Sequence, residues 1–286
     1  MADPTDHFAA FSFVDRITEF VPGTRARGVF YVPGAIRAFP ACLVAEAVGQ
    51  LAAWVSMEHL GYRGRPVAAL AGETRFLGAV APGDLLELTV EIDDVDDDAV
   101  AYHGWADVAG RRVIELNNCL GPMLPVAEFD APEALREQFA LLRGAGATPN
   151  RFHGVVAPDA ATVEHVPGQS VRANLDVPLT APFFADHFPR RPVFPATLLL
   201  NAQIALAARI AREARGGNGA TDPVPVRMTH VKMRAFIVPG QQVDARAEFA
   251  GMQDGTTQIL LSARDGDGKT IATARVEFAN AVAPSP

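Results

Sequence analysis

The sequence predicts an α+β fold in which one structural unit occurs twice. Each half contains a long apolar segment typical of a buried helix, and alternating apolar and polar residues typical of antiparallel strands follow it. The halves also repeat in sequence, because an offset of 155 residues places the Phe-Pro-Ala of residues 39–41 on the Phe-Pro-Ala of residues 194–196. A repeat of this length in a chain of 286 residues indicates two fused domains.

One long helix is predicted in each half, at residues 39–60 and at residues 194–215. Because these segments are apolar on nearly all sides, each helix must be buried, and a strongly twisted antiparallel sheet wrapped around it would bury it. The strands predicted for the sheets are residues 74–76, 86–90, 99–108 and 113–120 in the first half and residues 232–234, 243–249, 258–263 and 270–278 in the second.

The boundary between the halves is predicted near residue 150. Residues 129–143 carry charged side chains on one side and apolar side chains on the other, a pattern typical of an amphipathic helix that links two domains. Glycine and proline within residues 144–149 would end this helix. We therefore predict a first domain at residues 1–128, a linker at 129–150 and a second domain at 151–286.

Composition restricts the classes of function. Hydrophobic residues make up 49% of the chain and charged residues 20%, the balance of a globular protein. The net charge of -8 argues against a general affinity for nucleic acid or anionic membranes. Polar residues such as Glu46 and Asn201 interrupt the apolar segments, so membrane insertion is not expected. The N-terminal residues carry two acidic side chains by Asp6 and no long apolar run, so no signal peptide is expected. Cys42 and Cys119 form no disulfide framework and no metal-ligand pattern, which indicates a reducing, cytoplasmic location.

Residues 187–202 read H-F-P-R-R-P-V-F-P-A-T-L-L-L-N-A. This run resembles the signature H-F-P-x-x-P-V-x-P-G-x-L-x-x-E-A-x-x-Q of the bacterial 3-hydroxyacyl-ACP dehydratases of fatty acid synthesis. The matching positions are His187, Phe188, Pro189, Pro192, Val193, Pro195, Leu198 and Ala202. The pattern is long and ungapped, and the two repeats together cover residues 10–280. The resemblance implies a hot-dog fold, here a tandem fused double hot-dog.

The two repeats depart from the signature at different positions. The second repeat keeps the histidine, His187, but has Asn201 where the family has its catalytic acid. The first repeat keeps the acid, Glu46, and the later glutamine, Gln50, but has Val32 at the histidine position. In the family, each site takes its histidine from one hot-dog and its acid from the neighbouring one. The resemblance therefore implies one composite site of His187 and Glu46, while Val32 and Asn201 would form a pair without proton transfer.

The residue types of this pair suit the elimination of water from a 3-hydroxyacyl thioester. The reaction needs a base for the C2 proton, and histidine has an ordinary pKa of ~6.5, near the working pH. It also needs an acid for the leaving hydroxyl, and burial of Glu46 on an apolar helix should raise its pKa and keep it protonated. Backbone N–H groups at a helix start can stabilise the enolate, and Ala196, where the family has glycine, is the candidate donor.

Further residues are predicted to surround this pair. Gln50 is a candidate hydrogen-bond partner of Glu46. The residues predicted to line a substrate tunnel are Leu43, Cys42, Phe183, Phe184 and Phe194. For Cys42, a small buried apolar role is the alternative. The residues predicted to contact an acidic acyl carrier protein at the tunnel mouth are Arg190, Arg191, Lys232 and Arg234. A generic basic surface is the alternative for these four.

The predicted function is dehydration of a 3-hydroxyacyl thioester to a trans-2-enoyl thioester, with no metal and no cofactor. The predicted partner is an acyl carrier protein that presents the acyl chain on phosphopantetheine. One alternative is a hot-dog thioesterase, a class that generally lacks the His-Phe-Pro motif. Another is a catalytically silent acyl-binding partner of a fatty acid or polyketide assembly line. The sequence leaves open the acyl chain length and saturation, the choice between ACP and CoA, the pathway, and whether the fused pair is a monomer or a homodimer.

Overall fold

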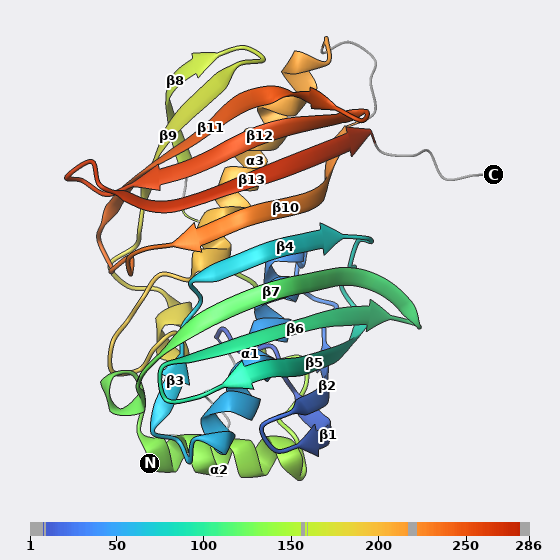
Figure 1. Ribbon diagram of the computed structural model, residues 1–286, viewed down its shortest axis with the longest axis vertical. Coiled ribbons are helices and arrows are strands. Elements are labelled where there is room, and N and C mark those ends of the chain that lie inside the picture. The colour runs from blue at the N-terminus through green and yellow to red at the C-terminus, as the bar shows by residue number, and fades with distance from the viewer. Residues whose placement is uncertain (1–7, 9, 156–157, 159, 217–221, 281–286) are drawn as a thin grey trace.

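The computed structural model describes residues 8, 10–155, 158, 160–216 and 222–280. These residues form thirteen antiparallel strands and three α-helices (Figure 1). The first half contains β1 (Arg16–Val21), β2 (Arg25–Tyr31), α1 (Ala41–His59), β3 (Gly64–Pro66), β4 (Leu70–Phe76), β5 (Leu85–Val95), β6 (Ala99–Val108) and β7 (Arg111–Pro125). A short 3-10 turn, η2 (Val126–Glu128), and α2 (Pro132–Arg143) follow. The second half contains β8 (Ala160–Val166), β9 (Ser170–Asp176), η3 (Pro182–Ala185), α3 (Ala196–Ala214), β10 (Pro223–Met233), β11 (Gln242–Gln253), β12 (Thr256–Arg264) and β13 (Thr270–Asn280).

The strands form one sheet that runs through both halves. Their order is β1-β2-β5-β6-β7-β4-β10-β13-β12-β11-β9-β8, and β3 pairs with β7 beside this path. The halves meet where β4 pairs with β10, with Thr74 opposite Met228 and Ala71 opposite Val231. The sequence predicts strands on both sides of this seam but not the seam itself, because a pairing between distant segments leaves no local signal.

Helices α1 and α3 lie on the same side of this sheet and contact each other (Figure 1). α1 packs on β2, β5 and β6, and α3 packs on β10, β11 and β12. Each begins directly after a proline, Pro40 or Pro195, whose fixed φ and missing N–H are compatible with a helix start. The two long helices that the sequence predicts are confirmed. None of the helices in the described part of the chain combines the length and the hydropathy needed to cross a bilayer.

The prediction from sequence differs from the structure at the outer strands and at the linker. Strands β1, β2, β3, β8 and β9 are absent from the prediction, and β8 is so exposed that no apolar alternation marks it. The linker helix begins at Pro132 and not at residue 129. Phe129 is fully buried and packs against Phe188 and Phe236, so it belongs to the core and not to a surface helix.

Candidate active site

A cavity of about 240 Å³ lies between the two halves and is lined by residues from both. One wall is α1, which presents Ala45, Gly49, Ala52 and Ala53 to the cavity. Because these side chains are small, they leave space beside an otherwise close-packed helix. The opposite wall comes from the segment between β3 and β4 and from the end of β10, and the turn before α3 closes the cavity from the second half.

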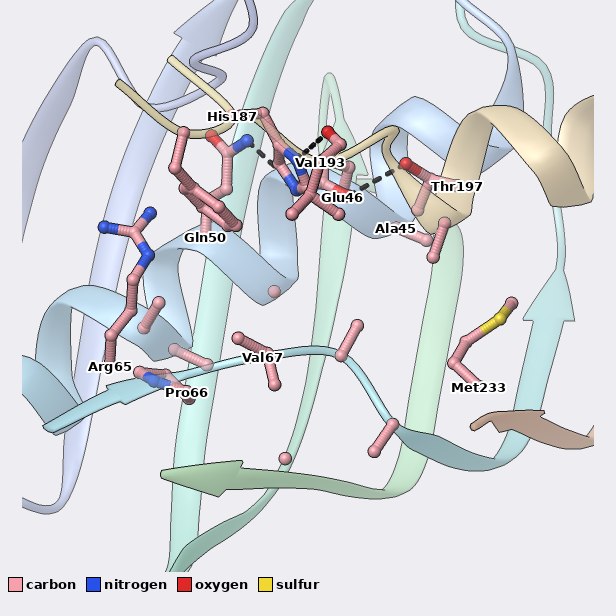
Figure 2. Close-up of a pocket in the computed structure, with 18 of the residues that line it drawn as sticks. Ala45, Glu46, Gln50, Arg65, Pro66, Val67, His187, Val193, Thr197 and Met233 are labelled. Atoms are coloured by element: carbon pink, nitrogen blue, oxygen red, sulfur yellow. Dashed lines mark hydrogen bonds between the residues drawn. The ribbon is translucent and has the colours of Figure 1, made fainter. Parts of the chain in front are cut away.

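Glu46 reaches this cavity from the second turn of α1, and two hydrogen bonds hold its carboxyl group (Figure 2). Thr197 Oγ1, in the first turn of α3, donates to Glu46 Oε2 over 2.9 Å. Gln50 Nε2, one helical turn further along α1, donates to Glu46 Oε1 over 3.1 Å. Since both carboxyl oxygens have a donor, the side chain has a defined orientation toward the second half.

His187 lines the same cavity and follows η3 in the second half (Figure 2). Its Nδ1 lies 2.8 Å from the backbone carbonyl of Val193. A carbonyl only accepts, so Nδ1 carries the hydrogen, and Nε2 of the neutral ring keeps its lone pair. The Phe188 ring stacks on the imidazole at a centroid distance of 4.1 Å and the Phe11 ring meets it edge-on at 5.6 Å. The tautomer and the ring orientation are both fixed.

Electrostatics favour the neutral form of this histidine. Burial is the largest influence and lowers the pKa of His187, because an enclosed site disfavours the charged imidazolium. Glu46 and the Val193 carbonyl raise this pKa, and the nearby Arg65 lowers it, with a net effect downward. Both groups line the same cavity. A neutral imidazole facing a carboxyl group is suited to general acid–base chemistry.

The N-terminal segment closes over this pair through side chains of both halves. Gln50 Oε1 accepts from the backbone N–H of Phe13 over 2.8 Å, and Gln50 Nε2 donates to the Phe11 carbonyl over 2.9 Å. From the other half, Asp186 Oδ2 accepts from the backbone N–H of Phe11 over 2.8 Å and from Ser12 Oγ over 3.1 Å. Asp186 is not among the residues predicted from sequence, although it directly precedes the His-Phe-Pro motif.

A buried arginine is the second feature that the sequence analysis missed. Arg65, on β3, lines the cavity and forms an ion pair with Asp130, whose side chain is also largely buried. Its guanidinium carbon lies 4.2 Å from the centroid of the Phe188 ring. Burial lowers the pKa of Arg65, while Asp130 and Glu46 raise it. Nothing in the local sequence marks this arginine, because its partners are brought together only by folding.

Some of the residues predicted from sequence line the cavity and others do not. Glu46, Gln50, His187, Phe194 and Ala196 all line the cavity. The roles of these residues, including the backbone N–H of Ala196 as a donor, remain predictions. Among the described residues, no group of three or more His, Cys, Asp and Glu side chains is arranged to hold a metal ion.

Four of the five residues predicted to line a substrate tunnel lie outside the lining of this cavity, and a role for them in a tunnel stays a prediction. Leu43, Cys42, Phe183 and Phe184 are buried in the hydrophobic core and do not line this cavity. Phe183 packs instead between Phe11, Phe184 and Phe194. Burial raises the pKa of the Cys42 thiol to about 12, so the alternative of a small buried apolar residue describes it better. The direction in which an aromatic ring beside the motif points cannot be read from the sequence.

The four basic residues predicted to contact a carrier protein are exposed. Arg190 donates to the Ala127 carbonyl over 3.1 Å, and Arg191 pairs with Glu128 and lies over the Phe236 ring. Arg234 donates to Thr273 Oγ1 over 3.1 Å, and Lys232 occupies an exposed position on β10. Phe236 lines the cavity, so Arg191 lies near the rim of the cavity. Contact with a carrier protein stays a prediction.

Residues 159–275 match the family model described as a FabA-like domain. This part of the chain is therefore similar to FabA-like domains. The chain also resembles the 3-hydroxyacyl-[acyl-carrier-protein] dehydratase FabZ of Yersinia pestis (strain Pestoides F), with 28% identity over 142 residues, 48% of this chain and 77% of the relative. FabZ of Yersinia pseudotuberculosis serotype O:1b (strain IP 31758) matches with the same identity and coverage. The FabA-like half contains His187 and all of α3, and the relatives link the chain to the hot-dog dehydratases.

Solved structures of similar fold extend over both halves. The tesB protein of Mycobacterium avium subs paratuberculosis has a TM-score of 0.57 and 14% identity, covering 98% of this chain and 100% of that protein. The 12:0-ACP thioesterase from Umbellularia californica has a TM-score of 0.54 and 10% identity, covering 90% and 94%. At these identities the likeness concerns the fold alone. It supports a hot-dog fold around the FabA-like half and does not bear on the reaction.

Proposed function

We propose that this protein dehydrates 3-hydroxyacyl thioesters to trans-2-enoyl thioesters at one composite site, with His187 as the base and Glu46 as the acid. The observation that supports this proposal is that the two residues, 141 positions apart in the chain, line one cavity. The similarity of the chain to FabZ dehydratases supports the same reaction. The hydrogen bonds to both groups supply the orientation that proton transfer requires.

The first step uses the free nitrogen of the histidine. His187 Nε2 removes a proton from C2 of the acyl chain, and the electron pair of that C–H bond moves toward the thioester carbonyl to give an enolate. The enolate oxygen carries the developing charge. Ala196 is the first residue of α3, and its N–H has no acceptor within the helix, so it can donate to this oxygen.

The second step uses the carboxylic acid. The electron pair returns to form the C2–C3 double bond, the C3–O bond breaks, and Glu46 gives its proton to the hydroxyl group, which leaves as water. His187 then holds one extra proton and Glu46 has lost one. Transfer of that proton between the two neighbouring groups restores the starting state, so the cycle consumes no cofactor.

The same proposal covers the architecture and the partner. Each half would be one hot-dog, with its part of the sheet wrapped around α1 or α3, and the domain limits would be residues 1–128 and 151–286 with a linker at 129–150. The substrate would arrive on the phosphopantetheine arm of an acyl carrier protein in the cytoplasm. The chain as a whole is acidic, so the exposed arginines near the cavity rim form a local basic surface. Such a surface supports binding of an acidic partner.

Turnover of a defined substrate tests the reaction. The full chain is incubated with a 3-hydroxyacyl-ACP, and mass spectrometry measures loss of one water from the acyl chain while a thiol reagent measures release of the carrier thiol. The expected result is an enoyl-ACP with no free thiol. Free thiol without the enoyl product would contradict the dehydratase and favour a thioesterase. Tight binding without either product would favour an acyl-binding protein without catalysis.

A further inference from the structure

The sheet contributes to the wall of the cavity one row of side chains that crosses four strands. Tyr102 on β6 pairs with Cys119 on β7, which pairs with Ala71 on β4. Ala71 in turn pairs with Val231 on β10. All four residues line the cavity, since directly opposite residues in neighbouring antiparallel strands point to the same face of a sheet. Tyr102 is the member of this row that carries a hydroxyl group.

Helix α1 leaves room for this hydroxyl at Gly49. A Cβ atom at Gly49 would lie 3.3 Å from the hydroxyl oxygen of Tyr102, which is tighter than most contacts of a Cβ atom. Glycine in the middle of a helix is destabilising relative to alanine, so the space it leaves is a reason for its presence. The offset of 155 residues places Ile204 at the equivalent position of α3, so the repeat itself does not require a glycine there. The space belongs to the half that carries Glu46.

The hydroxyl of Tyr102 lies about one helical turn from the proposed acid. Gly49 and Glu46 are three residues apart on α1, which places them on the same face of the helix and about 4.5 Å apart along its axis. In the same direction along α1, Ala53 and Met57 also line the cavity, and both are apolar. An acyl chain that extends along α1 from the carbons facing Glu46 therefore passes the hydroxyl of Tyr102.

The hydroxyl of Tyr102 has a weak hydrogen-bond partner in the described part of the chain. That partner is the thiol of Cys119, and a thiol is a weak donor and a weak acceptor. Burial raises the pKa of the Cys119 thiol to about 12 and the pKa of Tyr102 well above its usual value, so both groups keep their hydrogens. The thiol can donate to the phenol oxygen, which leaves the phenol O–H available to a ligand. Tyr102 is only half-buried and lines the cavity, so a ligand there can reach it.

We propose that Tyr102 determines substrate specificity, because its hydroxyl donates a hydrogen bond to a keto or hydroxyl oxygen on the acyl chain beyond the reacting carbons. This inference rests on the proposed function, since Glu46 sets where the reacting carbons lie. The substrate class is then an acyl thioester with an oxygenated chain. An oxygen taken out of water into an apolar cavity needs a new hydrogen bond, and Tyr102 supplies it. A site built to bind such a group discriminates against the analogue that lacks it.

The test uses unreactive thioethers that differ only in the chain. S-decyl-N-acetylcysteamine is the plain probe, and three derivatives carry a keto group at C5, C7 or C9 of the decyl chain. Calorimetry measures their dissociation constants with the full chain and with Tyr102→Phe, which keeps the ring and removes the hydroxyl. We expect Tyr102→Phe to raise the dissociation constant roughly three- to ten-fold for the keto probe whose oxygen reaches the hydroxyl, as for the loss of one hydrogen bond. The plain probe should bind both proteins within about two-fold of each other.

Tyr31→Phe is the matched control, because Tyr31 is a half-buried tyrosine on β2 of the same half and does not line the cavity. It should change none of the four dissociation constants. Thermal unfolding of both variants verifies that each one stays folded.

Unchanged dissociation constants of Tyr102→Phe for all three keto probes would overturn this inference, since the hydroxyl would then serve only Cys119. An equal loss of affinity for the plain probe would also overturn it, because the contact would then be to a part that all the probes share. The binding assay involves no turnover, so its result stands apart from the dehydration assay. Enoyl product without a keto-dependent effect of Tyr102 leaves the dehydratase intact and rejects the specificity. A keto-dependent effect without enoyl product does the reverse.

Discussion

The repeat places two equivalent sets of side chains in the molecule, and only one set surrounds the cavity. The first set is His187 and Thr197 from the second half with Glu46 and Gln50 from the first, and all four line the cavity. The offset of 155 residues maps them onto Val32, Cys42, Asn201 and Ala205. None of these four lines the cavity.

The equivalent set has lost each polar contact of the first. Val32 is fully buried and offers only its backbone, which pairs with Asp84 and Gly83. Cys42, which is buried, occupies the position equivalent to Thr197, the hydrogen-bond donor to Glu46. Ala205, which is exposed, occupies the position equivalent to Gln50, which holds the N-terminal segment. The difference indicates that the fold accommodates Val32, Cys42 and Ala205 at positions where the first set has His187, Thr197 and Gln50.

The largest difference between the two sets is expected when the proposed acid or base of the first set is removed. His187→Ala and Glu46→Gln should each lower kcat by about 10²–10⁴-fold, since each removes one proton transfer. The measurement is the rate of enoyl-ACP formation under saturating substrate. Retention of more than a tenth of the activity in either variant would reject the composite site.

The matched controls come from the equivalent set. Asn201→Ala should leave activity within about two-fold, because its side chain does not line the cavity. Val32→Ala should also leave most activity, although the truncation of a buried valine lowers the free energy of unfolding by roughly 1–3 kcal/mol. A large loss from Asn201→Ala would mean that two sites work, contrary to the one-site hypothesis.

A smaller effect is expected from the hydroxyl that orients Glu46. Thr197→Val keeps the shape but removes the donor to Glu46 Oε2, and kcat should fall roughly ten-fold, as for the loss of one hydrogen bond. KM should stay nearly constant, because the hydroxyl acts through the acid. Thr197→Ser should restore the rate. The equivalent change on the other side, Cys42→Ser, should not affect kcat, and an equal effect there would argue for a structural role.

The smallest expected effect is on the pH dependence of stability. The pKa of His187 is lowered in the folded protein, so the unfolded chain binds more protons below its ordinary pKa of ~6.5. The contribution of His187 to stability is therefore complete above pH ~6.5 and is lost as the pH falls toward the folded pKa. His187→Val, which copies Val32, should show a shallower loss of stability in urea unfolding between pH 8 and pH 5. An unchanged slope would show that His187 has an ordinary pKa.

Several features of the site were accessible from the sequence because they are local. The His-Phe-Pro run and the proline before each helix lie within short segments, and the alignment of Glu46 with Asn201 follows from comparing two such segments. The prediction that His187 and Glu46 share one site needed only the repeat and the resemblance to a family, and both residues line the same cavity. By contrast, the direction of Phe183 and Phe184 depends on the aromatic rings that meet them, and this packing cannot be read from neighbouring residues.

The repeat, the positions of the two long helices and the distribution of His187 and Glu46 between the halves could all be read from the amino-acid sequence. The pairing of β4 with β10, the cavity beside the small residues of α1 and the ion pair of Arg65 with Asp130 in its lining became visible in the folded chain alone. The physical reason is the range of the interactions. Helix starts and strand alternation are governed by adjacent residues, whereas cavities and buried ion pairs arise from contacts between segments far apart in the chain.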